Sequence, residues 1–172
     1  TQIAKGNDAR RKEDFNKYKV AFENFYNDND CYLSQAEWDA CTTCDGTCPA
    51  LDPYMEKFLC DPTTRTPYLY LSLVDEDDIP MDSCVGYRLF AKLQNKGDPD
   101  IIAAGCSWTL GCGKDPPLSQ YNYGIAVGGS LTSAKFVPNP TSTPTPTPTP
   151  PLIAPGNNFC LGDGSKDCNV KN

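Results

Sequence analysis

The sequence predicts an α+β fold, in which a long N-terminal amphipathic helix packs on a three- to four-stranded antiparallel sheet. Disulfide-rich loops and an extended Thr/Pro-rich C-terminal arm complete this expected fold. Three observations lead to it: a proline-free N-terminal stretch with aromatic residues at helical spacing, three later segments that alternate apolar with polar residues, and five cysteines in the connection between them. With 172 residues the chain has room for one such head and an appendage.

The N-terminal helix is expected over about residues 3–28. Its aromatic residues recur at intervals of three and four, which places them on one stripe that we expect to pack on the sheet. They are Phe15, Tyr18, Phe22 and Phe25. The basic run Arg10, Arg11 and Lys12 is followed by acidic residues, and we interpret it as a solvated helix face or a contact between subunits.

A long connection, residues 29–65, follows the helix and is expected to be stapled by disulfides. Within it, "ALDPYMEKFL" predicts a short helix that begins near Asp52, with Pro53 in its first turn. The sheet is expected within residues 66–136, which completes a globular head over 1–136. Its strands are predicted at 66–74, 84–94 and 120–129, where apolar or aromatic residues alternate with polar ones and turn-rich segments intervene.

The C-terminal part of the chain differs in composition from the head. Residues 137–155 hold eight of the sixteen prolines and carry Thr-Pro repeats, which predict a semi-rigid polyproline II linker whose threonines are candidates for O-glycosylation. Residues 156–172 are too few for a core of their own. We expect a tail closed by a bridge between Cys160 and Cys168.

Ten cysteines and no histidine point to an oxidising compartment and to disulfides rather than a zinc site. The disulfide candidates are Cys31, Cys41, Cys44, Cys48, Cys60, Cys84, Cys106, Cys112, Cys160 and Cys168. Sequence leaves their connectivity open, and only short-range pairs such as Cys106 with Cys112 are favoured.

Composition also argues against several functions. The net charge of −7 repels phosphate backbones, so no nucleic acid partner is expected. Without histidine the chain lacks an ordinary Ser–His or Cys–His pair, and "GCGK" lacks the spacing of a phosphate-binding loop. We therefore expect neither catalysis nor an obligatory cofactor.

Four stretches, in this order, resemble the globular region of type IV pilins and of the major pseudopilins of type II secretion systems. "DARRKEDFNKYKVAFENFYNDNDCY" is similar to the second half of the pilin N-terminal helix, and "LDPYMEKFLCDPTTRTPYLY" to the passage into the first strand. "YRLFAKLQNKGDPD" and "YNYGIAV" resemble the following strands, so the likeness covers about residues 3–130. Ten cysteines and the Thr-Pro arm depart from the family pattern.

This resemblance implies a structural subunit of a surface filament, which acts by polymerisation and display outside the cell. Family members have a leader cut by a prepilin peptidase and an apolar helical half that anchors the subunit in the membrane and packs into the filament. The chain is expected to begin where that half has been removed, so its partners would be further copies of itself and other pilins or pseudopilins.

Two alternatives stay open. One is a periplasmic, calcium-stabilised major pseudopilin, because secretion pseudopilins bind calcium in a loop and carboxylates are its ligands. The candidate calcium ligands are Asp75, Glu76, Asp77 and Asp78, or Asp98 and Asp100, or the tail residues Asp163, Ser165, Asp167 and Asn169. The other alternative is a secreted disulfide-rich adhesin or carbohydrate-binding module.

Overall fold

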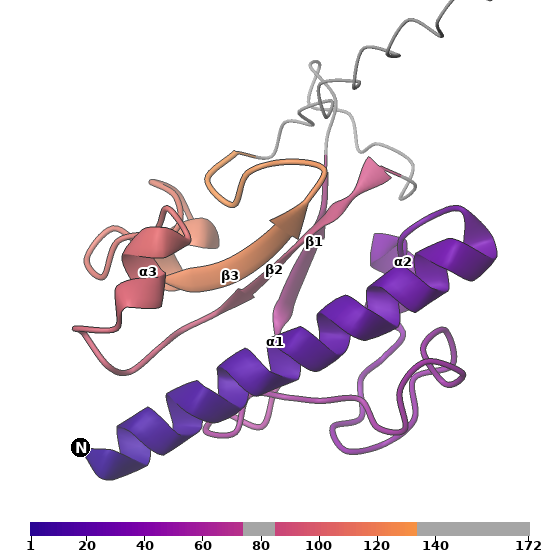
Figure 1. Ribbon diagram of the computed structural model, residues 1–172, viewed down its shortest axis with the longest axis horizontal. Helices are drawn as coiled ribbons and strands as arrows, with labels where there is room; N and C mark the ends of the chain where they lie inside the picture. The colour runs from indigo at the N-terminus through magenta and orange to yellow at the C-terminus, as the bar shows by residue number, and fades with distance from the viewer. Residues whose placement is uncertain (74–84, 134–172) are drawn as a thin grey trace, which may run out of the picture. The chain divides into compact units, whose positions relative to one another are not determined.

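The structure, a computed structural model, describes residues 1–73 and 85–133. The predicted α+β class is confirmed, because a long N-terminal helix accompanies a three-stranded antiparallel sheet in this part of the chain (Figure 1). The predicted linker and tail lie outside the described residues, and so does the acidic segment at 75–78.

Helix α1 runs over Gln2–Asn29 and has defined ends. The Thr1 hydroxyl accepts a hydrogen bond from the backbone N–H of Ala4 at the N-terminus. At the C-terminus Asp30 adopts a left-handed conformation, with φ of 56°, and its N–H donates to the carbonyl of Tyr26. No helix in the described residues is both long enough and apolar enough to cross a membrane.

The sheet contains β1 (Leu69–Ser72), β2 (Tyr87–Ala91) and β3 (Tyr123–Val127) in that spatial order. Each strand falls within a segment that the sequence predicted. Both pairs are antiparallel, with Leu71 opposite Arg88 and Arg88 opposite Ala126. The central strand β2 is buried along its whole length, which indicates that both faces of the sheet are covered.

Short helices occur in the connections. Helix α2 (Gln35–Asp39) begins with a capping box, in which Ser34 and Glu37 each accept from the other's backbone N–H. Helix α3 (Pro99–Ala103) and a 3₁₀ turn, η2 (Leu118–Gln120), lie between β2 and β3. The short helix predicted near Asp52 is wrong: that segment forms turns, and the connection's helix is α2 instead.

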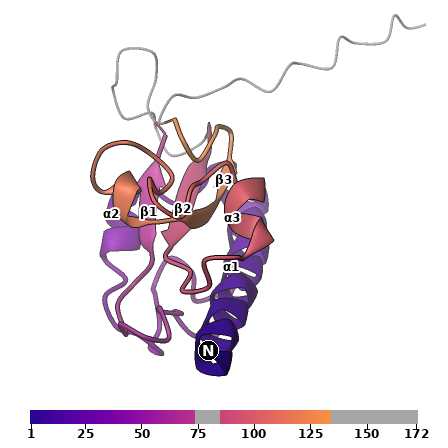
Figure 2. The same cartoon turned by 90° about the vertical axis from the view of Figure 1, so that its left-hand side faces the viewer.

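One face of the sheet packs against α1 (Figures 1 and 2). The four aromatic residues of the predicted stripe are buried there, each at most 7% exposed. The ring centroid of Phe22 lies 4.7 Å from that of Tyr87 on β2. The ring of Phe15 lies 5.0 Å from that of Tyr68. The Tyr18 hydroxyl donates to the carbonyl of Leu59 at 2.6 Å.

The opposite face of the sheet is covered by the segment between β2 and β3 and by the residues that follow β3. A second apolar cluster joins Phe90 of β2 to Ile101 of α3, Leu131 and the Cys106–Cys112 pair. The sheet is therefore the middle layer of the head.

Disulfides crosslink the connections, which confirms the prediction that disulfides staple these loops. Three pairs lie within the described residues: Cys41–Cys48, Cys44–Cys60 and the predicted Cys106–Cys112. Cys31 is also disulfide-bonded. Cys84, Cys160 and Cys168 lie outside the described residues, so the predicted pairing of the last two stays a prediction.

Replacing Phe22 by alanine tests the helix-to-sheet core. The ring is 1% exposed, so its loss leaves a cavity and should lower the free energy of unfolding by about 3–5 kcal/mol in chemical denaturation. Val20→Ala is the control on the same helix, because Val20 is 61% exposed. Equal effects of the two changes would contradict the described packing.

Candidate functional site at the base of α1

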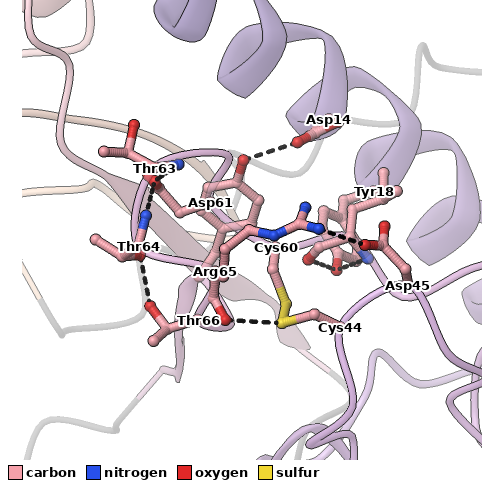
Figure 3. The surroundings of a disulfide bond; sticks show 12 residues. Asp14, Tyr18, Cys44, Asp45, Cys60, Asp61, Thr63, Thr64, Arg65 and Thr66 are labelled. Carbon is pink, nitrogen blue, oxygen red and sulfur yellow. Dashed lines mark hydrogen bonds and ion pairs between the residues drawn. A yellow bond between two sulfur atoms is a disulfide. The ribbon is translucent and has the colours of Figure 1, made fainter.

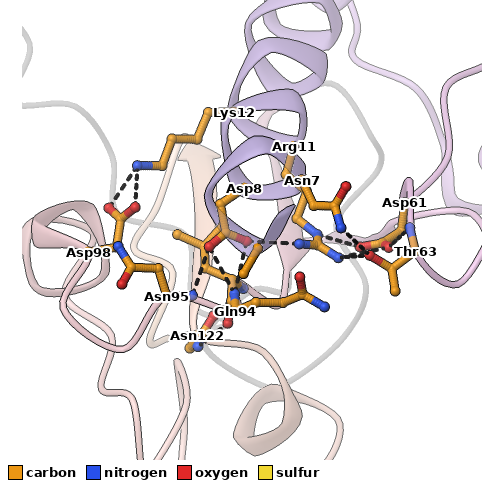
Figure 4. Close-up of polar contacts among 12 residues, drawn as sticks. Asn7, Asp8, Arg11, Lys12, Asp61, Thr63, Gln94, Asn95, Asp98 and Asn122 are labelled. Atoms are coloured by element: carbon orange, nitrogen blue, oxygen red, sulfur yellow. Dashed lines mark hydrogen bonds and ion pairs between the residues drawn. The ribbon is translucent and has the colours of Figure 1, made fainter. Parts of the chain in front are cut away.

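Charged and polar side chains join the first half of α1 to two loops, and we call this group the helix junction (Figure 4). Its members come from α1, from a turn that begins at residue 61, and from the loop that leads into α3. They are Asp8, Arg11, Lys12, Asp61, Thr63, Gln94, Asn95, Asp98 and Asp100.

Arg11 lies at the centre of the helix junction, and its side chain is 3% exposed. Its guanidinium binds Asp61 in bidentate fashion, with Nε 2.7 Å from Oδ2 and Nη2 3.0 Å from Oδ1. Nη1 donates to Asp8 at 2.8 Å, and Nη2 also donates to the Thr63 hydroxyl at 2.8 Å. All three nitrogens have partners, which is what a buried charge requires.

Asp8 connects Arg11 to the loop after β2. Its carboxylate accepts from the backbone N–H groups of Gln94 at 2.9 Å and Asn95 at 2.8 Å. The buried side chain of Asn122 holds the same loop, because its Oδ1 accepts from the N–H of Leu93 at 2.7 Å and its Nδ2 donates to the carbonyl of Leu93. The loop therefore presents its amides to α1 in a fixed position.

Lys12 makes the third attachment. Its ammonium lies 2.7 Å from a carboxylate oxygen of Asp98 and 2.6 Å from one of Asp100. Asp98 is also the N-cap of α3, where it accepts from the N–H of Asp100 at 3.1 Å. Lys12 thus links the start of α3 to α1.

A disulfide lies directly beside the acceptor of Arg11 (Figure 3). Cys60 is bonded to Cys44, and the next residue, Asp61, accepts from the N–H groups of Thr63 at 2.8 Å and Thr64 at 3.1 Å. The N–H of Asp61 donates to the carbonyl of Thr66. The turn and the crosslink together hold the Asp61 carboxylate in position for Arg11.

These contacts change the acidity of the groups involved. Burial alone would raise the pKa of Asp61, but the hydrogen bonds from Arg11, Thr64 and Thr63 lower it below its ordinary value. Burial would likewise lower the pKa of Arg11, whereas its carboxylate partners raise it. The pKa of Asp14, one turn further along α1, shifts in the opposite direction from that of Asp61. Burial raises the pKa of Asp14, although the hydroxyl of Tyr68 donates a hydrogen bond to its carboxylate.

The predicted solvent-facing basic run is wrong for Arg11, which is 2% exposed. Lys12 is partly buried in its ion pairs, and only Arg10 faces solvent. The reason lies in helix geometry: Arg11 is four residues before Phe15, so it continues the aromatic stripe towards the N-terminus.

Of the three predicted sets of calcium ligands, the structure describes only Asp98 and Asp100. Asp98 and Asp100 do lie together, but their carboxylates contact the ammonium of Lys12 rather than an open coordination site. Within residues 1–73 and 85–133, no group of three or more Asp, Glu, His or Cys side chains could hold a metal ion. The sets at Asp75–Asp78 and Asp163–Asn169 lie outside the described residues.

Comparison with protein-family models, with curated proteins and with solved structures finds no match for this chain. The likeness to pilins therefore remains an interpretation of the residues themselves.

The helix junction holds α1 in a fixed position on the head. Each of its charges faces an opposite charge, and Arg11 and Asp8 also satisfy hydrogen bonds of two separate loops. Such an arrangement fixes the angle and the axial position of α1 on the head.

We expect Arg11→Ala to lower the free energy of unfolding by about 3–5 kcal/mol, because it leaves the carboxylates of Asp8 and Asp61 buried without their cation. Arg10→Ala is the matched control, since Arg10 is exposed and the change there should stay within about 0.5 kcal/mol. Denaturation in urea measures both. Similar values for the two variants would show that the helix junction does not stabilise the head.

The pH dependence of unfolding tests the Asp61 pairing. A lowered pKa means that this carboxylate stabilises the head above its unfolded pKa, near 3.8, and that the contribution is lost as pH falls through the folded pKa. Asp61→Asn should therefore be less stable than the wild type at pH 7, and the gap should narrow below about pH 4. A gap independent of pH would contradict this charge pairing.

Proposed function

We propose that this chain is the head of a structural subunit of a type IV pilus-like surface filament, which acts by polymerisation and display. The observation that carries the proposal is the way α1 is held: one side of a 28-residue helix is fixed to the sheet and to the helix junction, while the other side is exposed. A filament subunit needs this combination, because its helix must both carry the head and contact neighbours.

The side of α1 that packs on the sheet and the helix junction supports the proposal, because it holds the helix rigidly to the head. In a filament the orientation of every head follows from the orientation of its helix, so a loose connection would disorder the surface. Here aromatic packing is reinforced at the N-terminal half by Arg11 and Lys12, whose partners Asp61, Thr63 and Asp98 lie 50, 52 and 86 residues away in the sequence. Disulfides then stabilise the connections against unfolding outside the cell.

The exposed side supports the proposal through its chemistry. Val20 is 61% exposed on α1 and borders an open hollow of about 630 Å³ that is also lined by Tyr54, Met55 and Leu59. Lys17 and Glu13 pair with each other at its edge. An apolar hollow with a charged edge beside a helix suits contact with another subunit.

The calcium-stabilised pseudopilin would share this head. No specific feature of the described residues favours it, because Asp98 and Asp100 are engaged by Lys12. The adhesin alternative predicts a conventional signal peptide and a secreted monomer. The experiment described next therefore distinguishes it from the filament subunit.

The test begins with the coding sequence upstream of Thr1. The proposal requires a short basic leader, a glycine before the cleavage point and about twenty apolar residues. Cells that express the whole gene should then show filaments in electron microscopy that an antibody against the head decorates. A conventional signal peptide that ends at Thr1, with secreted monomer and no filaments, would refute the proposal and favour the adhesin.

A surface variant examines the exposed side of α1. Val20→Asp should leave the melting temperature of the head nearly unchanged and reduce filament yield, because it places a charge in an apolar subunit contact. Leu110→Asp is the control, since Leu110 is 67% exposed but lies in the segment between β2 and β3 rather than on α1. Equal yields for both variants would exclude this side of α1 from assembly.

A further inference from the structure

A buried arginine on the other face of the sheet lacks a partner among the described residues. Arg88 is the second residue of the central strand β2, lies between Leu71 of β1 and Ala126 of β3, and is 4% exposed. Its Nε and Nη1 have no hydrogen-bond partner within residues 1–73 and 85–133. Its guanidinium carbon lies 5.7 Å from the ring centroid of Phe90, and this cation–π contact is the only charge-stabilising one that it makes in this part of the chain.

An unpaired buried guanidinium is costly. Arg11, which is buried to a similar degree in the same head, binds two carboxylates and a hydroxyl. Burial lowers the pKa of Arg88, with no carboxylate to oppose that shift. The contrast between the two arginines indicates that the partner of Arg88 is not supplied by the described residues.

Arg88 lines a cavity that can hold such a partner. The cavity has a volume of about 580 Å³ and lies over the face of the sheet opposite α1, where Leu71, Pro117 and Leu118 form apolar walls. Lys114 and Asp115, of opposite charge, also line it, yet no ion pair joins Asp115 to Arg88 among the described residues. Arg88 is therefore the buried charge of a mainly apolar cavity.

The wall of this cavity is preformed. The Cys106–Cys112 disulfide closes the loop that leads to Gly113 in the cavity wall, and the N–H of Cys112 donates to the carbonyls of Leu118 at 3.1 Å and Tyr121 at 2.7 Å. Gly111 has φ of 71°, and a side chain there would come within 2.6 Å of the Leu118 carbonyl oxygen, so the loop requires glycine. A preformed wall reduces the entropy lost when a ligand binds.

We propose that this cavity binds a small organic carboxylate, whose anionic group pairs with Arg88 and whose apolar body packs on Leu71, Pro117 and Leu118. A carboxylate binds a guanidinium in bidentate geometry through Nη2 together with either Nε or Nη1, so it would give a partner to one of the two unpaired nitrogens of Arg88. The apolar walls and the volume favour an organic acid over a bare inorganic ion. This site lies on the sheet face opposite α1 and does not depend on filament assembly.

The binding test uses the full 172-residue chain and isothermal titration with three probes: 4-methylpentanoate, acetate and inorganic phosphate. We expect 4-methylpentanoate to bind most tightly, and Arg88→Met to weaken it by at least about tenfold, the loss typical of a hydrogen bond to a charged group. Lys92→Met, an exposed lysine beyond the end of β2, should bind as the wild type does. If Arg88→Met does not fold, Arg88→Lys keeps the charge without the bidentate geometry and should also bind more weakly.

Melting without any probe gives an independent readout. In a buffer free of carboxylate and phosphate, Arg88→Met should melt above the wild type, because it replaces an unpaired buried charge by an apolar chain of similar length. Saturating 4-methylpentanoate should raise the melting temperature of the wild type alone. A wild type that melts above Arg88→Met without probe would show that Arg88 already has a partner within the chain, and would overturn the proposal. So would equal binding by the two proteins, tighter binding of phosphate, or no binding of 4-methylpentanoate at tens of millimolar.

Discussion

The bidentate pair between Arg11 and Asp61 is the interaction on which the arrangement of this head depends. It brings together a helix, a disulfide-linked turn and, through Asp8, the loop after β2. A buried charge of this kind contributes little net stability compared with an apolar replacement, but it tolerates few alternative geometries. Aromatic packing holds α1 against the sheet. The pair between Arg11 and Asp61 sets the position of the helix along its axis relative to the sheet.

The proposed function and the proposed ligand site use the two faces of one sheet. On one face, Arg11 and Lys12 have carboxylate partners and the helix is fixed, which suits a structural role. On the other face, Arg88 has no ionic partner among the described residues and lies beside a cavity whose wall is crosslinked and preformed. The two proposals are compatible in one chain, because α1 and the Arg88 cavity lie on opposite faces of the sheet.

Local patterns in the sequence were sufficient for the class of fold, the long helix and the position of each strand. They failed where long-range contacts decide the outcome. The charge of Arg11 led to its assignment to a solvated helix face or a subunit contact. Arg11 instead occupies the stripe of Phe15 extended by one turn, and that spacing was the available signal. Arg88 alternates with apolar residues as an outward-facing strand residue would. The segment after β2, which no local pattern predicts, covers the sheet face on which Arg88 lies, and Arg88 is buried there.

The buried residues of α1 lie at positions 8, 11, 14, 15, 18, 21, 22 and 25, a repeat of seven on a helix of 3.6 residues per turn. Because such a repeat drifts by about 20° in each heptad, the contact line winds around the helix by roughly 50° between its ends. The surface of the head that contacts α1 is therefore expected to follow a gently winding line rather than a straight one. Moving α1 along its axis would therefore also require it to rotate relative to the head. A force applied along the helix axis would act on the head partly as a torque.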